Sequence, residues 1–182
     1  MAESLYRRVL GARFDTLDPA VQHLHSRGGH WHCPGRCTVE PAPGRIGRML
    51  AGALGLPRAA VDAEFRFELC VDAEGETWIR HFPHRAMRSR QFAEGPGLLG
   101  ECLGPARFAF RPEADGGALN LNLVDLRVFG LPWPRRLFPR VHARERGEGA
   151  RFHFDIDVHL GPLGRLVAYR GHLDLDRIEV IA

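Results

Sequence analysis

The chain has 182 residues, 45% of them hydrophobic, which is enough for one domain with a sizeable core. It contains no apolar run that could span a bilayer, and its start, MAESLYRRVL, lacks the features of a secretory signal, which favours a cytoplasmic protein. All 25 basic residues are arginine, and the net charge of +3 is spread along the chain, which argues against nucleic-acid binding.

Three helices are predicted before residue 58. Residues 3–11 place leucine and valine on one side of a helix, and Pro19–Ser26 follows Asp18, a residue type that caps helix starts. Apolar residues recur at helical spacing in 44–56, with arginine on the other side. This third helix could form a lid or lie on a membrane, but one short apolar stripe with two basic residues favours packing on a sheet.

The segment GHWHCPGRCTVE contains four side chains that suit a soft metal ion such as zinc: His30, His32, Cys33 and Cys37. Their spacing, C-x3-C with H-x-H, does not match the paired C-x2-C knuckles of structural zinc sites. No glycine-rich phosphate loop follows a strand and opens a helix. We therefore predict neither a metal nor a cofactor, and we interpret the segment as a buried Cys and Trp beside surface histidines.

Beyond residue 57 the chain is predicted to be almost entirely β-strand. Phe65–Val71 alternates apolar with mostly charged side chains, and Glu74–Gly75 turns the chain back. A later hairpin turns at Asp115–Gly116, and the apolar phase shifts at Val124, which indicates a β-bulge. Prolines in the next segment, FGLPWPRRLFP, exclude a central strand, so its apolar side chains could plug the end of a barrel or cover a pocket.

The clearest strand pattern lies in Arg151–Leu175. Every second residue from Phe152 to Leu160 is apolar, and the residues between them are His or Asp. Such alternation is typical of a strand with one buried face and one polar face. A Gly-Pro-Leu-Gly turn follows, and the return strand carries apolar residues in a matching phase.

Two hairpin registers follow from this pattern. If Gly161–Gly164 forms the second turn, the apolar faces coincide and Asp155 lies opposite Arg170. If Gly147–Ala150 closes the hairpin before it, His142 lies opposite Asp155. The predicted result is a grid of His, Asp and Arg side chains on the polar face of three strands.

This polar grid has two interpretations. As a catalytic site, His142, Asp155 and His172 would act in acid–base chemistry. As a solvent-exposed face, the same residues would form weak cross-strand ion pairs, which is common for antiparallel sheets. We favour the solvent-exposed face, and no serine of the chain stands in a nucleophile motif.

Four stretches together, LYRRVLGARFDTLDPAVQHLH, GRCTVE, TWIRHF with RSR, and RFHFDIDVHLGPLGRLVAYRGHL, resemble a bacterial family known as a domain of unknown function, DUF4166. The resemblance extends over about Leu5 to Leu175 and is most specific in the last stretch. Members of that family occur alone or fused to saccharopine-dehydrogenase-like oxidoreductases. The resemblance thus implies an accessory or ligand-binding role and supplies no catalytic residues.

We expect one domain over residues 1–182, with a helical part over 1–57 and a β meander over 61–182. The fold class is mainly β (α+β): a strongly curved antiparallel sheet or open barrel of about nine to ten strands, with two or three N-terminal helices packed on it.

A barrel of this size favours a non-enzymatic binding module for a small hydrophobic or amphipathic molecule. The expected ligand-binding residues are Phe108, Phe110, Trp133, Phe152, Phe154, Ile156, Tyr169 and Arg170. Two alternatives remain open: a cofactor-independent enzyme that uses the polar grid, and an interaction domain that docks to an oxidoreductase.

Overall fold

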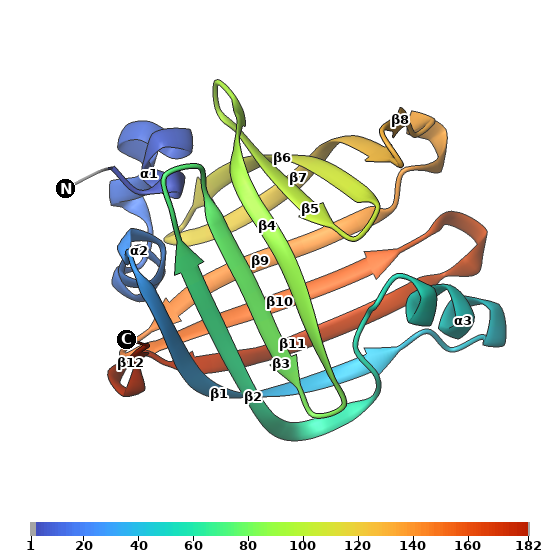
Figure 1. Ribbon diagram of the computed structural model, residues 1–182, viewed down its shortest axis with the longest axis horizontal. Helices are drawn as coiled ribbons and strands as arrows, with labels where there is room; N and C mark the ends of the chain where they lie inside the picture. Colours follow the sequence, from blue (N-terminus) through green and yellow to red (C-terminus); the bar gives the residue numbers. More distant parts are fainter. Residues whose placement is uncertain (1–2, 182) are drawn as a thin grey trace.

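Ten antiparallel strands close into a barrel in the computed structural model, which describes residues 3–181 (Figure 1). They follow the order β11-β10-β9-β7-β6-β5-β4-β3-β2-β1, and β1 pairs with β11 to complete the ring. The strands are β1 (His30–Pro41), β2 (Ala60–Val71), β3 (Glu76–Phe82), β4 (Arg85–Gly95), β5 (Leu98–Leu103), β6 (Ala106–Asp115), β7 (Ala118–Val128), β9 (Arg140–Glu148), β10 (Arg151–His159) and β11 (Arg165–Asp174). The predicted mainly β class is confirmed, and the barrel is closed.

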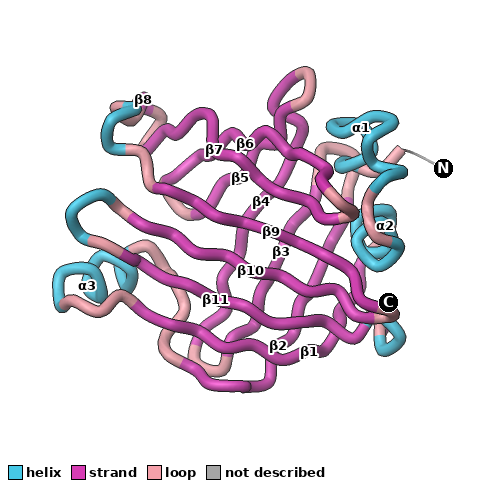
Figure 2. The backbone as a smooth tube through the Cα atoms, turned by 180° about the vertical axis from the view of Figure 1, so that it is seen from behind, coloured by secondary structure: helices cyan, strands magenta, loops and turns pink. Residues whose placement is uncertain are grey.

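Helices lie at both ends of this barrel (Figure 1). At one end lie α1 (Leu5–Leu10), a 3-10 helix (Gly11–Thr16) and α2 (Pro19–Ser26), together with β12 (Glu179–Val180), which pairs with β1 after a 3-10 turn at Leu175–Arg177 (Figures 1 and 2). At the other end lie α3 (Arg45–Ala53), β8 (Leu131–Pro132) and 3-10 turns at Arg135–Leu137 and Gly161–Leu163. None of the helices within residues 3–181 is long and apolar enough to cross a membrane.

The end beneath α1 and α2 is filled by side chains. Tyr6, Phe14 and Leu24 from the helical segment are almost fully buried, as is Trp31 at the start of β1. Both helices are short, so their stability comes from burying this apolar face rather than from helix propensity. Each large side chain buried here contributes about 1.5–3 kcal/mol. The hydrophobic packing therefore closes this end of the barrel.

The β10–β11 hairpin has the predicted register. Asp155 lies opposite Arg170, and Val158 lies opposite Val167. Phe152 and the other apolar residues of β10 point into the barrel, while the His and Asp residues point outward. Alternation along the strand thus sets which face is inside.

The β9–β10 register differs from the prediction by two residues. β9 continues to Glu148, the turn is Gly149–Ala150, and His142 lies opposite Asp157 rather than Asp155. Gly147 stays in the strand because its N–H donates to the Asp18 carboxylate at 2.8 Å. A shift by two keeps every side chain on its predicted face, but it changes the cross-strand partners.

The two earlier hairpins show the same two-residue difference. Two-residue turns at Glu74–Gly75 and Asp115–Gly116 predict Val71 opposite Trp78 and Phe110 opposite Leu121, whereas the structure pairs Val71 with Glu76 and Phe110 with Leu123. Gly116 and Gly117 form the turn of β6–β7, with φ of 55° and 84°, so Asp115 still pairs within the ladder. Two successive positive φ angles are what a two-residue hairpin turn of type I′ requires. In β2–β3, the Asp72 carboxylate accepts hydrogen bonds from the N–H groups of Glu74 and Gly75, which widens the turn. The β-bulge near Val124 is present, as a register shift between Ala109 and Phe110 on β6.

The predicted helical part, residues 1–57, contains a twelve-residue strand, β1. Trp31, Cys33, Cys37 and Val39 alternate toward the core along it. The sequence predicts only a short strand here, over Arg36–Glu40, because Pro34 and Gly35 interrupt the pattern before it. Pairing on both sides, with β2 and with β11, extends the strand through these residues.

Chemical labelling tests the placement of the cysteines on β1. Burial raises the pKa of Cys33 to about 12 and that of Cys37 to about 11, and a thiol reacts only as its thiolate. In the folded protein at pH 8, iodoacetamide is expected to leave both unmodified while the partly exposed Cys70 reacts, as read by peptide mass spectrometry. Modification of Cys33 as fast as Cys70 would contradict the buried position.

Candidate functional site

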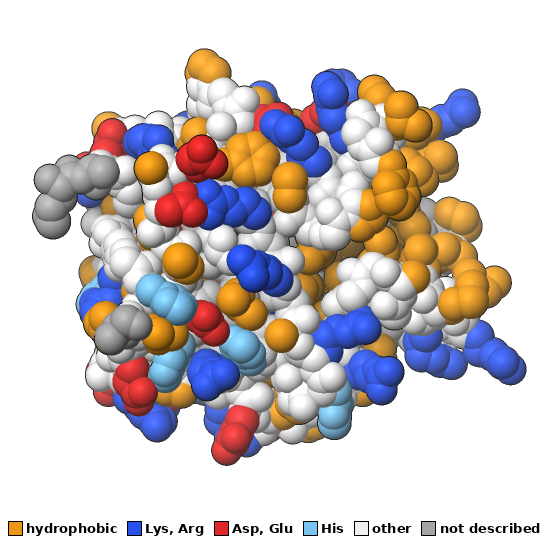
Figure 3. All heavy atoms as spheres, in the orientation of Figure 1, with side chains coloured by type: hydrophobic (Ala, Val, Ile, Leu, Met, Phe, Trp, Pro, Cys, Tyr) orange, Lys and Arg blue, Asp and Glu red, His pale blue; other side chains and the backbone are white. Residues whose placement is uncertain are grey.

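The barrel encloses a cavity of about 880 Å³ that is open at the end carrying α3 and β8. Figure 3 shows this end as a hollow lined by hydrophobic side chains. Most of the lining is apolar. It comes from the inward faces of the strands β2 to β7 and β9 to β11, and from α3 and the segment 129–139. The cavity is within the size range of pockets that hold one small molecule.

Seven of the eight predicted ligand-binding residues line this cavity: Phe108, Phe110, Trp133, Phe152, Phe154, Ile156 and Tyr169. The eighth, Arg170, lies on the outer face, because it follows the inward-facing Tyr169 in the strand. Its guanidinium donates to the Glu40 carboxylate of β1. Arg170 is therefore not part of the cavity lining.

A set of polar side chains meets the cavity toward the end covered by α1 and α2. We call it the polar floor: Tyr6, His25, Arg80, Gln91, Glu101 and Glu145. Four of them, on β3, β4, β5 and β9, contribute directly to the lining, and the other two come from α1 and α2. The interior is thus apolar along the walls and polar at the floor.

Two short hydrogen bonds connect the helices to the floor. Nε2 of His25 lies 2.6 Å from Oε2 of Glu145, with the His25 side chain fully buried. The Tyr6 hydroxyl donates to Oε1 of Gln91 at 2.8 Å. The Tyr6 and His25 rings lie 3.7 Å apart between centroids and are tilted by 30° to each other. Burial, and then the charge of Glu145, raises the pKa of Tyr6 well above its ordinary value, so the phenol remains a donor.

Arg80 is the cation of the polar floor. Its Nη1 donates to Oγ of Ser89 at 3.0 Å, its Nη2 lies 3.6 Å from Oε1 of Glu101, and its guanidinium lies over the Trp78 ring. Burial opposes the charge, but Tyr169 and Glu101 raise the pKa of Arg80 in net effect. The polar floor therefore offers a fixed positive group beside carboxylates inside an apolar cavity.

The polar floor was missed at the sequence level, although a signal exists. Arg80 stands between Trp78 and Phe82 in the inward phase of β3, and Glu101 follows Leu99 in the inward phase of β5. Glu145 follows Val141 and Ala143 in the same way on β9. A charged residue in the apolar phase of a strand is the pattern that identifies such a site, because burying it demands a partner.

The four metal candidates on β1 do not converge. Cys33 and Cys37 point inward and are buried, whereas His30 and His32 alternate with Trp31 and Cys33 and lie in the outward phase. His30 instead contacts Glu68 at 2.9 Å. Within residues 3–181, no group of three or more His, Cys, Asp or Glu side chains is arranged to hold a metal ion.

The predicted polar grid lies on the outside of the barrel. A shallow depression of about 320 Å³ contains His142, Asp155 and Asp157, with Asp155 exposed to solvent. His172 lies elsewhere, beside His153 with 5.8 Å between ring centroids. The three catalytic candidates are thus not gathered in one enclosed site.

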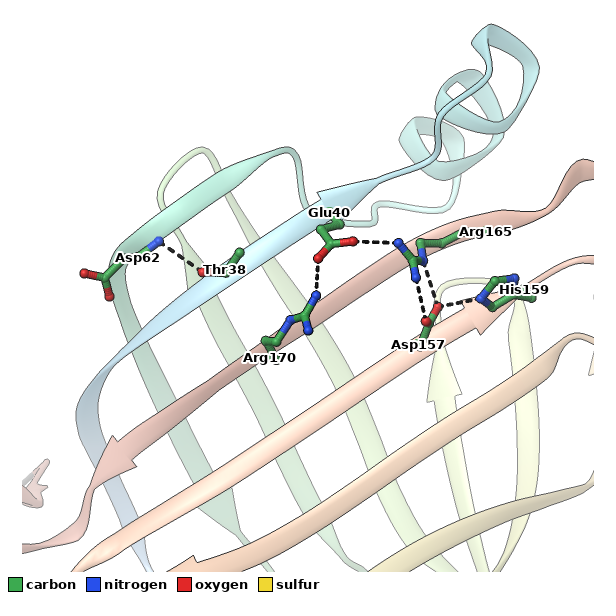
Figure 4. A network of polar contacts seen from close by, with 7 residues as sticks. All are labelled: Thr38, Glu40, Asp62, Asp157, His159, Arg165 and Arg170. Carbon is green, nitrogen blue, oxygen red and sulfur yellow. Dashed lines mark hydrogen bonds and ion pairs between the residues drawn. The ribbon is translucent and has the colours of Figure 1, made fainter.

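An ion-pair network crosses the outer face of β1, β11 and β10 (Figure 4). Arg165 joins Glu40 at 2.6 Å to Asp157 at 3.0 Å, and His159 contacts Asp157 at 2.9 Å. Partial burial opposes ionisation of Asp157, but hydrogen bonds from Arg165 and His159 lower its pKa in net effect. Arg170 completes the network through Glu40. These contacts bridge the seam where β1 and β11 close the barrel.

Two solved structures show low overall similarity to this chain. One is the crystal structure of a "secretary abundant heat soluble (SAHS)" protein from Ramazzottius varieornatus, with 13% identity, 81% of this chain and 93% of that chain covered, and a TM-score of 0.40. The other is Rv2717c from M. tuberculosis, with 13% identity, 87% and 98% covered, and a TM-score of 0.43.

No curated protein matches the sequence significantly. A family model described as a domain of unknown function, DUF4166, matches residues 17–173, which is most of the chain and includes every barrel strand except the last residue of β11. The match lies inside the region over which the resemblance was recognised from the sequence. The chain therefore belongs to the DUF4166 family.

Proposed function

We propose that the barrel is a non-enzymatic binding module for one small amphipathic molecule. The observation that carries this proposal is the cavity of about 880 Å³, apolar along its walls and charged at its floor. The apolar body of the ligand would lie against Phe108, Phe154 and Ile156. Its polar end would reach Arg80 and Glu101, which lie inside the barrel.

The polar floor supports an amphipathic ligand over a purely apolar one. A buried guanidinium and carboxylates cost free energy unless they are hydrogen-bonded, and a ligand head group can supply additional partners. Burial in a medium of low polarity also strengthens such contacts. The catalytic role of His142, Asp155 and His172 stays a prediction, and so does docking to an oxidoreductase.

A cavity-filling substitution tests the proposal. Ala143 points inward from β9 and lines the cavity, so Ala143→Trp is expected to occupy space that the ligand needs. Binding of a fluorescent fatty acid, 11-(dansylamino)undecanoic acid, should weaken at least about tenfold, equivalent to about 1.4 kcal/mol. The measurement is a fluorescence titration with each protein.

The matched control is Ala86→Trp, which adds the same side chain to an exposed position on the outward face of β4. Its affinity for the probe should equal that of the unmodified protein. Urea denaturation of both variants verifies that they fold. Undiminished probe binding by folded Ala143→Trp, or equal weakening by the two variants, would overturn the cavity as the binding site.

A further inference from the structure

A ring of exposed hydrophobic side chains surrounds the opening of the cavity. We call it the mouth surface; its apolar residues are Ile46, Met49, Phe129, Leu131, Trp133, Leu137 and Leu163. Met49 is 72% exposed, Phe129 81% and Leu131 71%. Scattered single hydrophobic residues are normal on a protein surface, but a contiguous group of this size marks an interaction site.

Three segments far apart in the sequence contribute to the mouth surface. They are α3, the segment 129–139 that includes β8, and the turn between β10 and β11, which lie together at one end in both views of the chain (Figures 1 and 2). Each also supplies cavity-lining residues: Leu50, Trp133 and Leu160. The apolar ring is thus continuous with the apolar wall of the cavity (Figure 3).

The charge of these segments has a single sign. Residues 41–61, 126–144 and 158–173 contain no Asp or Glu. Exposed arginines lie among them: Arg45, Arg48, Arg135, Arg136 and Arg140. The apolar ring is therefore bordered by positive charge, which complements an anionic surface.

The backbone at Phe129 holds a large side chain outward. Phe129 has a φ of 52°, in the left-handed region that bulky residues rarely adopt. Its N–H donates to the carbonyl of Pro105 at 2.9 Å, and the N–H of Trp133 donates to the carbonyl of Leu126 at 2.8 Å. A strained conformation kept in an exposed aromatic residue points to a functional role for that side chain.

We propose that the mouth surface docks on a bilayer rich in anionic lipids. The apolar residues would enter the interfacial layer, and the arginines would contact lipid phosphates. Taken alone, α3 has too short an apolar stripe for this role, but the barrel adds two further segments beside it. Docking in this orientation places the cavity opening against the acyl chains, so an amphipathic ligand could enter without crossing water.

Vesicle co-sedimentation tests this proposal without any ligand. The unmodified protein is expected to bind vesicles of phosphatidylcholine with about 30% phosphatidylserine at least about tenfold more tightly than pure phosphatidylcholine vesicles, and binding should weaken as salt rises. Trp133 is the exposed tryptophan at the mouth, whereas Trp31 and Trp78 are buried. A blue shift of tryptophan fluorescence on binding would therefore report insertion of the mouth.

Paired variants identify the surface responsible. The mouth variant Met49→Asp/Arg135→Glu is expected to lose at least about tenfold in vesicle affinity. The control variant, Val180→Asp/Arg177→Glu, makes the same kinds of change near the opposite end of the barrel, where Val180 is 73% exposed. It should bind like the unmodified protein, and thermal melts verify the fold of both.

Three outcomes would overturn the proposal: no binding of the unmodified protein to anionic vesicles at low salt, equal binding by the mouth and control variants, or a dimer in light scattering that the mouth variant converts to a monomer. The last would assign the surface to a second copy of the chain. Because the dansyl probe is titrated without vesicles, failure of docking leaves the cavity proposal unaffected.

Discussion

Replacing Glu145 with Ala is expected to lower the free energy of unfolding by about 3 kcal/mol. The substitution leaves the His25 imidazole buried without its carboxylate partner, and losing one side of a buried polar pair costs far more than losing an exposed one. The His25 Nδ1 atom already lies buried with no hydrogen-bond partner among the described residues. The Glu145 contact is therefore the one that compensates for burying this ring and that holds α2 on the barrel.

Urea denaturation gives the free energy for this test. Glu145→Gln should lower the free energy of unfolding less than Glu145→Ala does, because an amide can still form a hydrogen bond with the imidazole. The matched control is Glu148→Ala, which removes a carboxylate from the same strand at a position where its side chain is 72% exposed. Glu148→Ala should lower the free energy of unfolding by less than about 1 kcal/mol. Equal losses for Glu145→Ala and Glu148→Ala would show that the buried pair does not stabilise the fold.

Replacing Gly35 with Ala is expected to lower the free energy of unfolding by about 3 kcal/mol or more, because the added Cβ obstructs closure of the barrel. A Cβ built on Gly35 would overlap the carbonyl oxygen of His172 on β11. The same holds on the opposite strand, where a Cβ built on Gly171 would overlap the carbonyl oxygen of Arg36 on β1. Neither backbone atom can move aside as a flexible side chain could, so β1 and β11 would have to separate locally.

Gly52→Ala is the control for this substitution. Gly52 lies in α3, and a Cβ there has no neighbour within 4 Å, so Ala should be neutral or stabilising by up to about 1 kcal/mol. Urea denaturation and near-ultraviolet circular dichroism compare the two variants. A Gly35→Ala protein as stable as Gly52→Ala would show that the seam tolerates a side chain at this position.

The hairpin registers show which strand pairings could be predicted from the sequence alone. The β10–β11 register was predicted correctly, with Asp155 opposite Arg170. Three other hairpins were displaced by two residues, because the turn length depends on local interactions that apolar periodicity does not encode. An example is the hydrogen bond between Gly147 and Asp18, residues far apart in the chain.

In the candidate site, too, one part could be predicted from the sequence and another part could not. The apolar wall could be predicted, since Phe108, Phe154 and Ile156 share the inward phase of their strands. The polar floor could not be assembled, because its members come from α1, α2 and four strands of the barrel. The floor residues are adjacent only after the ring of strands has closed.

The sequence by itself determined which face of each strand is buried and that the fold is mainly β. Alternation with a period of two is a local property, so it survives even an incorrect register. The tertiary structure alone decided the closure of β1 on β11, the burial of His25 against Glu145 and the gathering of three distant segments around one opening. Each of these depends on pairing between distant residues, which the geometry of the closed barrel sets.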